Sequence, residues 1–267
     1  MSSLATALIT GASSGIGAVY ADRLARRGHD LILVARDAAR LDALAKRLEA
    51  ETGIKAEVFA ADLSDRDDLG RIERRIESDD AIGLVVNNAG FGDIGDVLDS
   101  DPATLDRMVD VNVVAVNRLA IAAARAFAKR GTGAVVNIAS VVAFIPEQVH
   151  ATYSATKSFV LTLTQSLAAH VGDRGVKFQA VLPGATRTEF FDRAGGSLDR
   201  LPAEMLMHVD DLVDAALAGF DAGELVTIPS LPDPADWQAL EAARAALGPN
   251  LSRDRPAARY GVRRAAA

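Results

Sequence analysis

Residues 150–157 read HATYSATK, which places Tyr153 and Lys157 four residues apart. On a helix this spacing brings both side chains to one face, about 5–6 Å apart at Cβ. Because an ammonium close to a phenol stabilises the phenolate, Lys157 is expected to lower the pKa of Tyr153 from about 10 to roughly 7–9. Such a phenol can donate a proton to a carbonyl oxygen as a hydride arrives, or accept it in the reverse reaction. The same spacing also arises by chance, so its meaning depends on the surrounding residues.

Two polar residues upstream could serve the same chemistry. Ser140 follows an apolar run at 134–139 and could donate a hydrogen bond to a substrate oxygen where negative charge develops. It could instead cap the end of a strand. Asn112 lies within the helical pattern of 103–130, where an asparagine could simply kink the helix by bonding to its backbone.

The four histidines do not have the spacing of a metal site. They are His29, His150, His170 and His208, and the chain has no cysteine. Only His150 lies near Tyr153, where it could touch a substrate or, in the interpretation we prefer, begin the helix that carries the tyrosine. The sequence therefore predicts no metal centre.

The stretch TGASSGIG, residues 10–17, follows an apolar run and opens a helical pattern. Gly11, Gly15 and Gly17 permit a tight turn, and the N–H groups of the helix N-terminus suit a pyrophosphate. The spacing is G-x3-G-x-G rather than the usual G-x-G-x-x-G. GASSG also matches the nucleophile elbow of a serine hydrolase, but that elbow needs an earlier strand, and only three residues precede the first expected strand. A glycine turn that binds nothing remains an alternative.

Arg36 follows the second apolar run, at the position where a dinucleotide fold meets the adenosine ribose. A guanidinium there suits the 2′-phosphate of NADP, and Arg40 follows one helical turn later. Asp37 partly offsets this positive charge. We therefore expect NADP, with NAD as the less favoured cofactor, and a solvated surface arginine as the alternative interpretation of Arg36.

Elements that could position these residues alternate along the chain. Apolar strands are predicted at 4–10, 31–35, 56–60, 82–86, 134–139, 177–182 and 225–228. Helices are predicted at 15–28, 37–52, 65–78, 103–130, 152–172, 209–222 and 233–247. This alternation indicates an α/β fold, a single-domain, Rossmann-type, doubly wound parallel sheet of about seven strands with helices on both faces. The domain is expected over 1–250, followed by a basic tail over 251–267.

Composition excludes several classes of protein. The formal net charge is −7 and the sequence pI is about 5.2, the wrong sign for binding nucleic acid through its phosphates. The first ten residues lack the pattern of a signal peptide, and we find no stretch of about 18 uncharged apolar residues. A cytoplasmic protein without a membrane or nucleic-acid partner is expected.

Together these residues resemble the short-chain dehydrogenase/reductase family over nearly the whole chain. The matching pieces stand in family order and are Thr10-Gly11-x3-Gly15-x-Gly17, Asp62-Leu63, Asn87-Asn88-Ala89-Gly90, Asn112, Ser140, Tyr153-x3-Lys157 and Pro183-Gly184. Each piece is weak alone, and their conjunction is specific. The stretch between 184 and 209 is short and an extra helix follows the last strand, so the wall of the substrate pocket does not transfer from the family.

The resemblance implies a role for each matched position. Tyr153 is expected to be the general acid, Lys157 its charge partner and a ribose ligand, and Ser140 a hydrogen-bond donor to the substrate, which Tyr153 also contacts. Asn112 is expected to hold a water that links Lys157 to a proton relay. Besides Tyr153 and Lys157, the expected cofactor contacts are Gly11, Ser13, Ser14, Gly15, Ile16, Gly17, Arg36, Asp62, Leu63, Asn88, Ala89, Gly90, Pro183, Gly184, Thr186 and Thr188.

The expected activity is hydride transfer between NADPH and a carbonyl compound or secondary alcohol. A lipophilic or aromatic ketone, or a 3-oxoacyl compound, is expected because apolar residues cluster around the site: Val141, Val142, Phe144, Ile145, Val149, Phe190, Phe191, Met205 and Met207. The alternatives are a non-catalytic NADP sensor of the same fold and a nucleotide-sugar epimerase or dehydratase, which resembles a longer chain.

The helices at 103–130 and 152–172 have too few charges for helices with one face in water. Alanines would allow close approach of a second copy across a two-fold axis: Ala115, Ala120, Ala122 and Ala123. The family resemblance points to the same helices, so a homodimer or homotetramer is expected.

Overall fold

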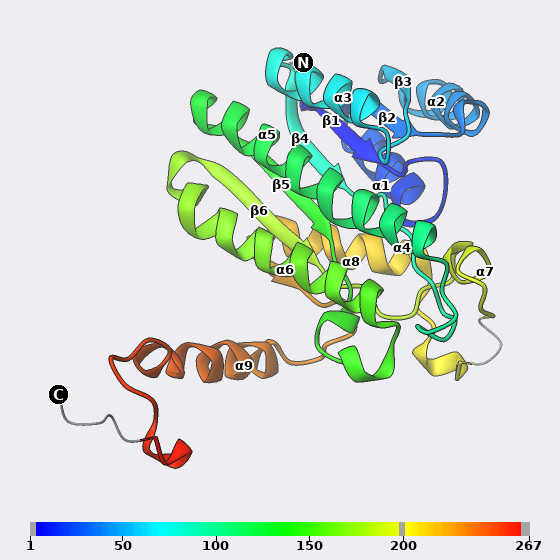
Figure 1. The fold of residues 1–267 in the computed structure, drawn as a ribbon. Helices are drawn as coiled ribbons and strands as arrows, with labels where there is room; N and C mark the ends of the chain where they lie inside the picture. Colours follow the sequence, from blue (N-terminus) through cyan, green and yellow to red (C-terminus); the bar gives the residue numbers. More distant parts are fainter. Residues whose placement is uncertain (1–3, 198–200, 263–267) are drawn as a thin grey trace. The chain divides into compact units, whose positions relative to one another are not determined.

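The computed structural model describes residues 4–197 and 201–262, and its core is a seven-stranded parallel sheet (Figure 1). The strand order is β3-β2-β1-β4-β5-β6-β7, so the chain winds outward from β1 in two directions. The strands are β1 (Leu4–Thr10), β2 (His29–Ala35), β3 (Ala56–Ala60), β4 (Ile82–Asn87), β5 (Gly133–Ile138), β6 (Val176–Val181) and β7 (Val226–Thr227). The predicted doubly wound Rossmann-type sheet is confirmed.

Helices cover both faces of the sheet because successive strand side chains point to opposite sides. Ala7 and Ile9 of β1 join the core beneath one layer, which consists of α1 (Gly15–Arg26), α2 (Ala38–Thr52) and α8 (Val209–Asp221). Leu8 joins the core beneath the other layer, which consists of α3 (Arg66–Ser78), α5 (Val116–Arg130) and α6 (Ala151–Val171). Buried apolar runs in the strands therefore produce two cores, one on each face.

Aspartates cap most of the helices that follow strands. Asp37 accepts a hydrogen bond from the backbone of α2, Asp65 from α3, and Asp101 from α4 (Pro102–Val109). Helix α1 differs, because its N-cap Ser14 makes no side-chain hydrogen bond and its first turn has no acidic residue. The N–H groups of its first turn are therefore left for another acceptor.

The predicted helix over 103–130 is not regular along its whole length. Helix α4 passes into a π-helical segment at Asp110–Ala115, and α5 begins at Val116. A π segment interrupts the regular hydrogen-bond ladder and redirects the side chains that it carries. It holds Asn112, which is 1% exposed. The short helix α7 (Phe190–Arg193) was not predicted from the sequence.

Contacts divide the chain into two compact units, one ending at Pro229 and the other beginning at Ser230. The second unit contains α9 (Pro234–Ala246), a helix without a buried residue. This division differs from the predicted boundary at residue 250, so a domain over 1–250 with a tail over 251–267 stays a prediction. Residues 1–3, 198–200 and 263–267 of those ranges lie outside the described residues.

One helical stretch, Pro102–Arg130, is long and apolar enough to cross a membrane by length and composition. Its most apolar window has a mean hydropathy of 1.4, but 56% of that window is buried inside the protein. This burial is typical of a core helix. The expected cytoplasmic location and the absence of a membrane partner stay predictions.

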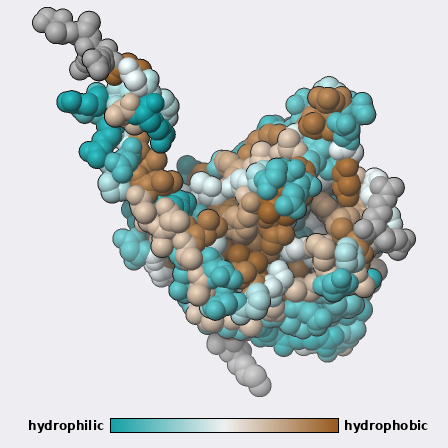
Figure 2. Space-filling model, turned by 90° about the horizontal axis from the view of Figure 1, so that it is seen from below, coloured by the Kyte–Doolittle hydropathy of each residue, from teal (hydrophilic) through white to brown (hydrophobic). Residues whose placement is uncertain are grey.

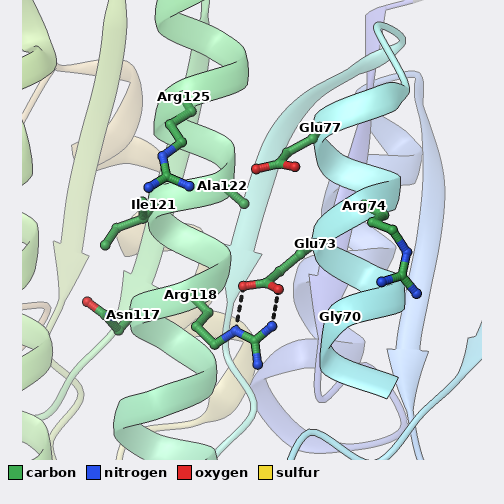
Figure 3. A pocket seen from close by; sticks show the side chains of 9 residues that line it. All are labelled: Gly70, Glu73, Arg74, Glu77, Asn117, Arg118, Ile121, Ala122 and Arg125. Atoms are coloured by element: carbon green, nitrogen blue, oxygen red, sulfur yellow. Dashed lines mark hydrogen bonds and ion pairs between the residues drawn. The ribbon is translucent and has the colours of Figure 1, made fainter. Parts of the chain in front are cut away.

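The expectation that four alanines of this stretch face a second subunit is wrong. Ala115, Ala120, Ala122 and Ala123 are at most 3% exposed and belong to the core of their own chain. Figure 3 shows Ala122 on α5 facing α3, beside the ion pair between Arg118 and Glu73. The small side chains allow α5 to pack closely on its own sheet and on α3.

Candidate active site

Tyr153 and Lys157 lie on the first two turns of α6, as their spacing predicts. The amine of Lys157 is buried, and Nζ donates to the carbonyl of Ile138 at 2.9 Å. The same nitrogen lies 5.8 Å from the centroid of the Tyr153 ring. The end of β5 and the start of α6 therefore hold a phenol and an amine side by side.

The pKa values of this pair differ from the expectation. Burial raises the pKa of the Tyr153 hydroxyl above its usual range, and a hydrogen bond with Ser140 opposes that rise. Burial also lowers the pKa of Lys157 to about 8. The expectation that Lys157 alone brings the tyrosine to roughly 7–9 is therefore wrong for the protein by itself. Removal from water disfavours the charged form of both groups.

Ser140 caps the turn after β5 and also bonds to Tyr153, and its expected contact with a substrate stays a prediction. Its hydroxyl accepts a hydrogen bond from the backbone of Val142 at 3.3 Å, which caps the turn after β5. The hydroxyl also donates to the carbonyl of Pro183 at 3.3 Å, and it bonds to Tyr153. It is thus close enough to the phenol to contact the same substrate oxygen.

Asn112 is tied to the loop after β4 and to α6. Its amide donates to the carbonyl of Phe91 at 2.8 Å and to the hydroxyl of Thr156 at 3.2 Å, and its carbonyl accepts from the backbone of Phe91 at 3.1 Å. A Cβ at Gly90 would lie 3.0 Å from Oδ1 of Asn112 and 3.5 Å from Nζ of Lys157. Asn112 therefore holds the loop so that Gly90, which has no side chain, lies beside the buried amine of Lys157.

The glycine turn is held against the end of β4. Asn88 donates to the carbonyls of Thr10 and Gly11 at 2.9 and 3.2 Å, and the Thr10 hydroxyl accepts from the backbones of Asn88 and Ala89. Gly11 has a positive φ of 66°, and a Cβ at Gly17 would lie 2.3 Å from the carbonyl of Gly11. The Asn88 side chain thus serves the turn itself. Ser13, Ser14 and Ile16 complete the turn and are partly exposed.

The residues expected to meet the adenosine, Arg36, Asp62 and Leu63, lie after the ends of β2 and β3. The Arg36 side chain is exposed and has no hydrogen bond or ion pair among the described residues. Burial acts to raise the pKa of Asp62, but two hydrogen bonds from Ser64 and the charge of Arg36 hold it below its usual value. The Leu63 side chain is 7% exposed and packs in the core, so a ligand could meet only its backbone.

The loop after β6 lies against the glycine turn. Pro183 is buried, and the hydroxyl of Thr186 donates to the carbonyl of Gly184 at 3.0 Å. A Cβ at Gly15 would lie 3.3 Å from the methyl group of Thr188. The structure therefore places the glycine turn, expected to bind the pyrophosphate, against the loop after β6, which the family resemblance assigns to the cofactor.

Two features of the site were not predicted. The ring of Phe190 lies 5.6 Å from the ring of Tyr153, centroid to centroid, so α7 covers the phenol from the loop after β6. The Ser100 hydroxyl bonds to Nε2 of His150 at 3.0 Å and donates to Asp93 at 2.8 Å, which ties the loop after β4 to the start of α6. His150 stands at the start of α6, where its side chain makes no capping hydrogen bond, in agreement with our preferred interpretation that it begins this helix. The only signal of the Phe190 packing in the sequence was the pair of adjacent aromatic residues, Phe190 and Phe191, close after Thr188.

No group of three or more acidic, histidine or cysteine side chains that could hold a metal occurs within residues 4–197 and 201–262. The expectation of a metal-free site stays a prediction. Apolar residues instead gather in a hollow on the face of the molecule shown in Figure 2.

Comparison with known proteins decides the family. The family model for short chain dehydrogenase matches residues 5–196, well over half of the chain. The chain belongs to the short-chain dehydrogenase family.

Two solved structures match this short-chain dehydrogenase over nearly its full length. A short-chain dehydrogenase from Sphingobium yanoikuyae, in complex with NADPH, is 51% identical with a TM-score of 0.93, and the match covers 96% of this chain and 100% of that one. The bulky-bulky ketone specific alcohol dehydrogenase from Comamonas testosteroni, in its orthorhombic crystal form, is 47% identical with a TM-score of 0.90, and the match covers 97% and 99%.

A curated relative matches over a shorter stretch. The very-long-chain 3-oxoacyl-CoA reductase of Anas platyrhynchos is 32% identical over 202 residues, which are 73% of this chain and 64% of that protein. This short-chain dehydrogenase therefore spans less than two thirds of that relative's length.

The residues of this short-chain dehydrogenase fit a nicotinamide dinucleotide. The α1 N-terminus lacks a side-chain cap, Gly90 leaves a side-chain-free position beside Lys157, and the exposed Arg36 at the end of β2 has no hydrogen bond or ion pair with the residues that the structure describes. These three features lie at the ends of β1, β4 and β2, on the edge of the sheet where such folds bind ligands.

The buried amine of Lys157 should make stability depend on pH. Its folded pKa of about 8 lies below the unfolded value of 10.5, so between these values the unfolded chain binds more protons and the free energy of unfolding rises with pH. Urea unfolding should show this rise, by up to about 1.4 kcal/mol per pH unit, between about pH 8 and about pH 10. Lys157→Met should remove it. An equal slope in both proteins would show that the amine is not desolvated.

Proposed function

We propose that this short-chain dehydrogenase is an NADP-dependent oxidoreductase that transfers a hydride between NADPH and a carbonyl compound or secondary alcohol. The observation that carries the proposal is the Tyr153 phenol, whose hydroxyl bonds to Ser140 and whose ring centroid lies 5.8 Å from the buried amine of Lys157. A protein that only senses a nucleotide has no use for this arrangement of donors. The NADPH complex of the relative at 51% identity supports the cofactor.

In this proposal Tyr153 donates its proton to the carbonyl oxygen, and Ser140 donates a hydrogen bond to the same oxygen as it gains negative charge. Lys157 binds the ribose and supplies positive charge beneath the phenol. Asn112 holds the loop at Gly90 clear of the amine and, as the family resemblance implies, a water between Lys157 and solvent. NADP supplies the hydride when reduced and a positive ring when oxidised.

The cofactor contacts follow the edge of the sheet. We assign the pyrophosphate to the uncapped start of α1 at Gly15, and the 2′-phosphate to Arg36. Asp62 and the backbone at Leu63 are assigned to the adenine. Residues 88–90 line the groove, and the loop from Pro183 to Thr188 meets the nicotinamide.

We propose a lipophilic or aromatic ketone, or a 3-oxoacyl compound, as substrate. Phe190 packs on Tyr153, and Phe191 packs edge-on against Phe190, so the approach to the phenol is aromatic. The relative at 47% identity is specific for bulky-bulky ketones, and the relative at 32% identity is a 3-oxoacyl-CoA reductase. NADPH oxidation, followed across ketones, aldehydes and 3-oxoacyl thioesters, separates these classes from a non-catalytic sensor, which would oxidise none.

Tyr153→Phe should keep NADPH binding, because the ring remains, and lose turnover at least about 100-fold, because the proton donor is gone. Steady-state ketone reduction measures the loss, and fluorescence titration with NADPH measures the binding. Turnover within a few-fold of the unchanged protein would remove Tyr153 from the mechanism.

Arg36→Asp should shift preference from NADPH toward NADH. A carboxylate would repel a 2′-phosphate and accept hydrogen bonds from free ribose hydroxyls. The measurement is kcat/KM for both cofactors with one ketone. A ratio that does not change would make Arg36 a bystander.

We propose that the protein is a homodimer or homotetramer that pairs through the outer faces of α5 and α6. A surface hollow between these helices is lined by Ile121, Ala124, Ala128, Leu167 and Val171 together with three basic side chains. Ala124 belongs to the core, and the other four apolar residues lie outside it or at its edge, so a second copy could cover them without disturbing the fold.

Ile121→Arg should leave the fold intact and release a species of 28.0 kDa, because Ile121 is only partly buried and a charge there would oppose pairing. Sedimentation at micromolar concentration measures the mass, and circular dichroism checks the fold. Ala122→Arg is unsuited to this test, since Ala122 is 3% exposed inside the chain. A 28.0 kDa species for the unmutated protein would contradict pairing.

A further inference from the structure

Arg40, at the start of α2, pairs with an acidic side chain from the segment that follows β6, three strands away from β1 along the same edge of the sheet. Its Nη1 donates to both carboxylate oxygens of Glu189, at 3.2 and 3.0 Å. Glu189 lies after β6, next to Thr188. The ion pair therefore joins the helix after β2 to the loop that follows β6.

The two arginines at this end of the site are in different states. Arg36 has no hydrogen bond or ion pair within the described ranges, whereas Arg40 faces Glu189 and also lies 3.5 Å from Asp37. Hydrogen bonds and charge from Arg40 and Arg193 hold the pKa of Glu189 below its usual value, so the carboxylate is ionised at neutral pH. Two carboxylates thus offset the positive charge of Arg40.

The partner of Arg40 belongs to the segment that encloses the site. Thr188, one residue before Glu189, lies against Gly15 of the glycine turn, and Phe190, one residue after it, packs on Tyr153. Arg40 is also the second basic group after β2, one helical turn beyond Arg36. A dinucleotide laid along this edge, with its 2′-phosphate at Arg36, would also bring that phosphate toward Arg40, with which Glu189 already pairs.

We propose that Glu189 is a specificity-determining residue that competes with the 2′-phosphate of NADP for Arg40. This inference rests on the proposed NADP-dependent function. When the phosphate binds Arg40, Glu189 still has an ion-pair partner. That partner is Arg193, the last residue of α7, which follows Glu189 in the chain. NADH carries a neutral 2′-hydroxyl in place of the phosphate and gains no ion pair from Arg40. Glu189 therefore reduces the preference for NADPH without reducing the use of NADH.

The test is the ratio of kcat/KM for NADPH to kcat/KM for NADH, measured with one ketone at low salt. Glu189→Gln keeps the shape of the side chain and removes its charge. The ratio should rise about two- to five-fold, the effect of a half-exposed ion pair, through a higher kcat/KM with NADPH. A ratio that does not change, or that falls, would overturn the proposal.

Glu204→Gln is the matched control, because Glu204 is exposed in the same chain segment between β6 and α8 and has no ion pair among the described residues. It should leave the ratio unchanged, and an equal rise would trace the effect to net charge and overturn the proposal. In an Arg40→Gln background, Glu189→Gln should have no effect, since the contested cation is gone. A persistent effect there would also overturn it. If Arg36→Asp shifts the ratio but Glu189→Gln does not, only this inference fails and the NADP-dependent function stands.

Discussion

The arrangement of the site depends on a lysine that the fold removes from water. Lys157 is 6% exposed, and its amine has one hydrogen bond among the described residues, to the carbonyl of Ile138. Burial of a charge is costly unless partners compensate for it, so the surroundings of the amine are constrained. A Cβ at Gly90 would lie 3.0 Å from Oδ1 of Asn112, Asn112 bonds to Phe91 of the same loop, and the Tyr153 ring centroid lies 5.8 Å from the amine. An additional polar ligand at this site would offset the cost of burying the Lys157 amine.

A buried polar chain fixes the helix that carries this pair. The Asn87 amide on β4 donates to Asn137 on β5 at 2.8 Å, and the Asn137 amide donates to Thr164 on α6 at 2.9 Å. A shift of α6 along the sheet would break these bonds and leave buried polar groups without partners, which costs free energy. The bonds set the register of α6 on the sheet, and with it the height of Tyr153 above the end of β5.

Residue periodicity was enough to predict every strand and the order of the helices, because buried parallel strands and amphipathic helices leave distinct patterns. The glycine turn and the Tyr153–Lys157 pair were also found, since their chemistry depends on local spacing. Contacts between distant segments were not. The pairing of Glu189 with Arg40, the packing of Phe190 on Tyr153 and the inward-facing alanines of α5 depend on tertiary geometry. Desolvation, which reversed the expected pKa of Tyr153, also depends on burial that spacing does not show.

In the proposed mechanism Tyr153 is the acid of the reaction, and positive charge from the bound cofactor offsets its burial. The chain has three tyrosines, Tyr20, Tyr153 and Tyr260, so an ultraviolet titration corrected with the Tyr153→Phe protein isolates one phenol. Without cofactor, Tyr153 should ionise above the usual value of about 10. With saturating NADP⁺ its pKa should fall by at least about one unit, since a nearby positive charge favours the phenolate. The same titration curve with and without NADP⁺ would contradict the account.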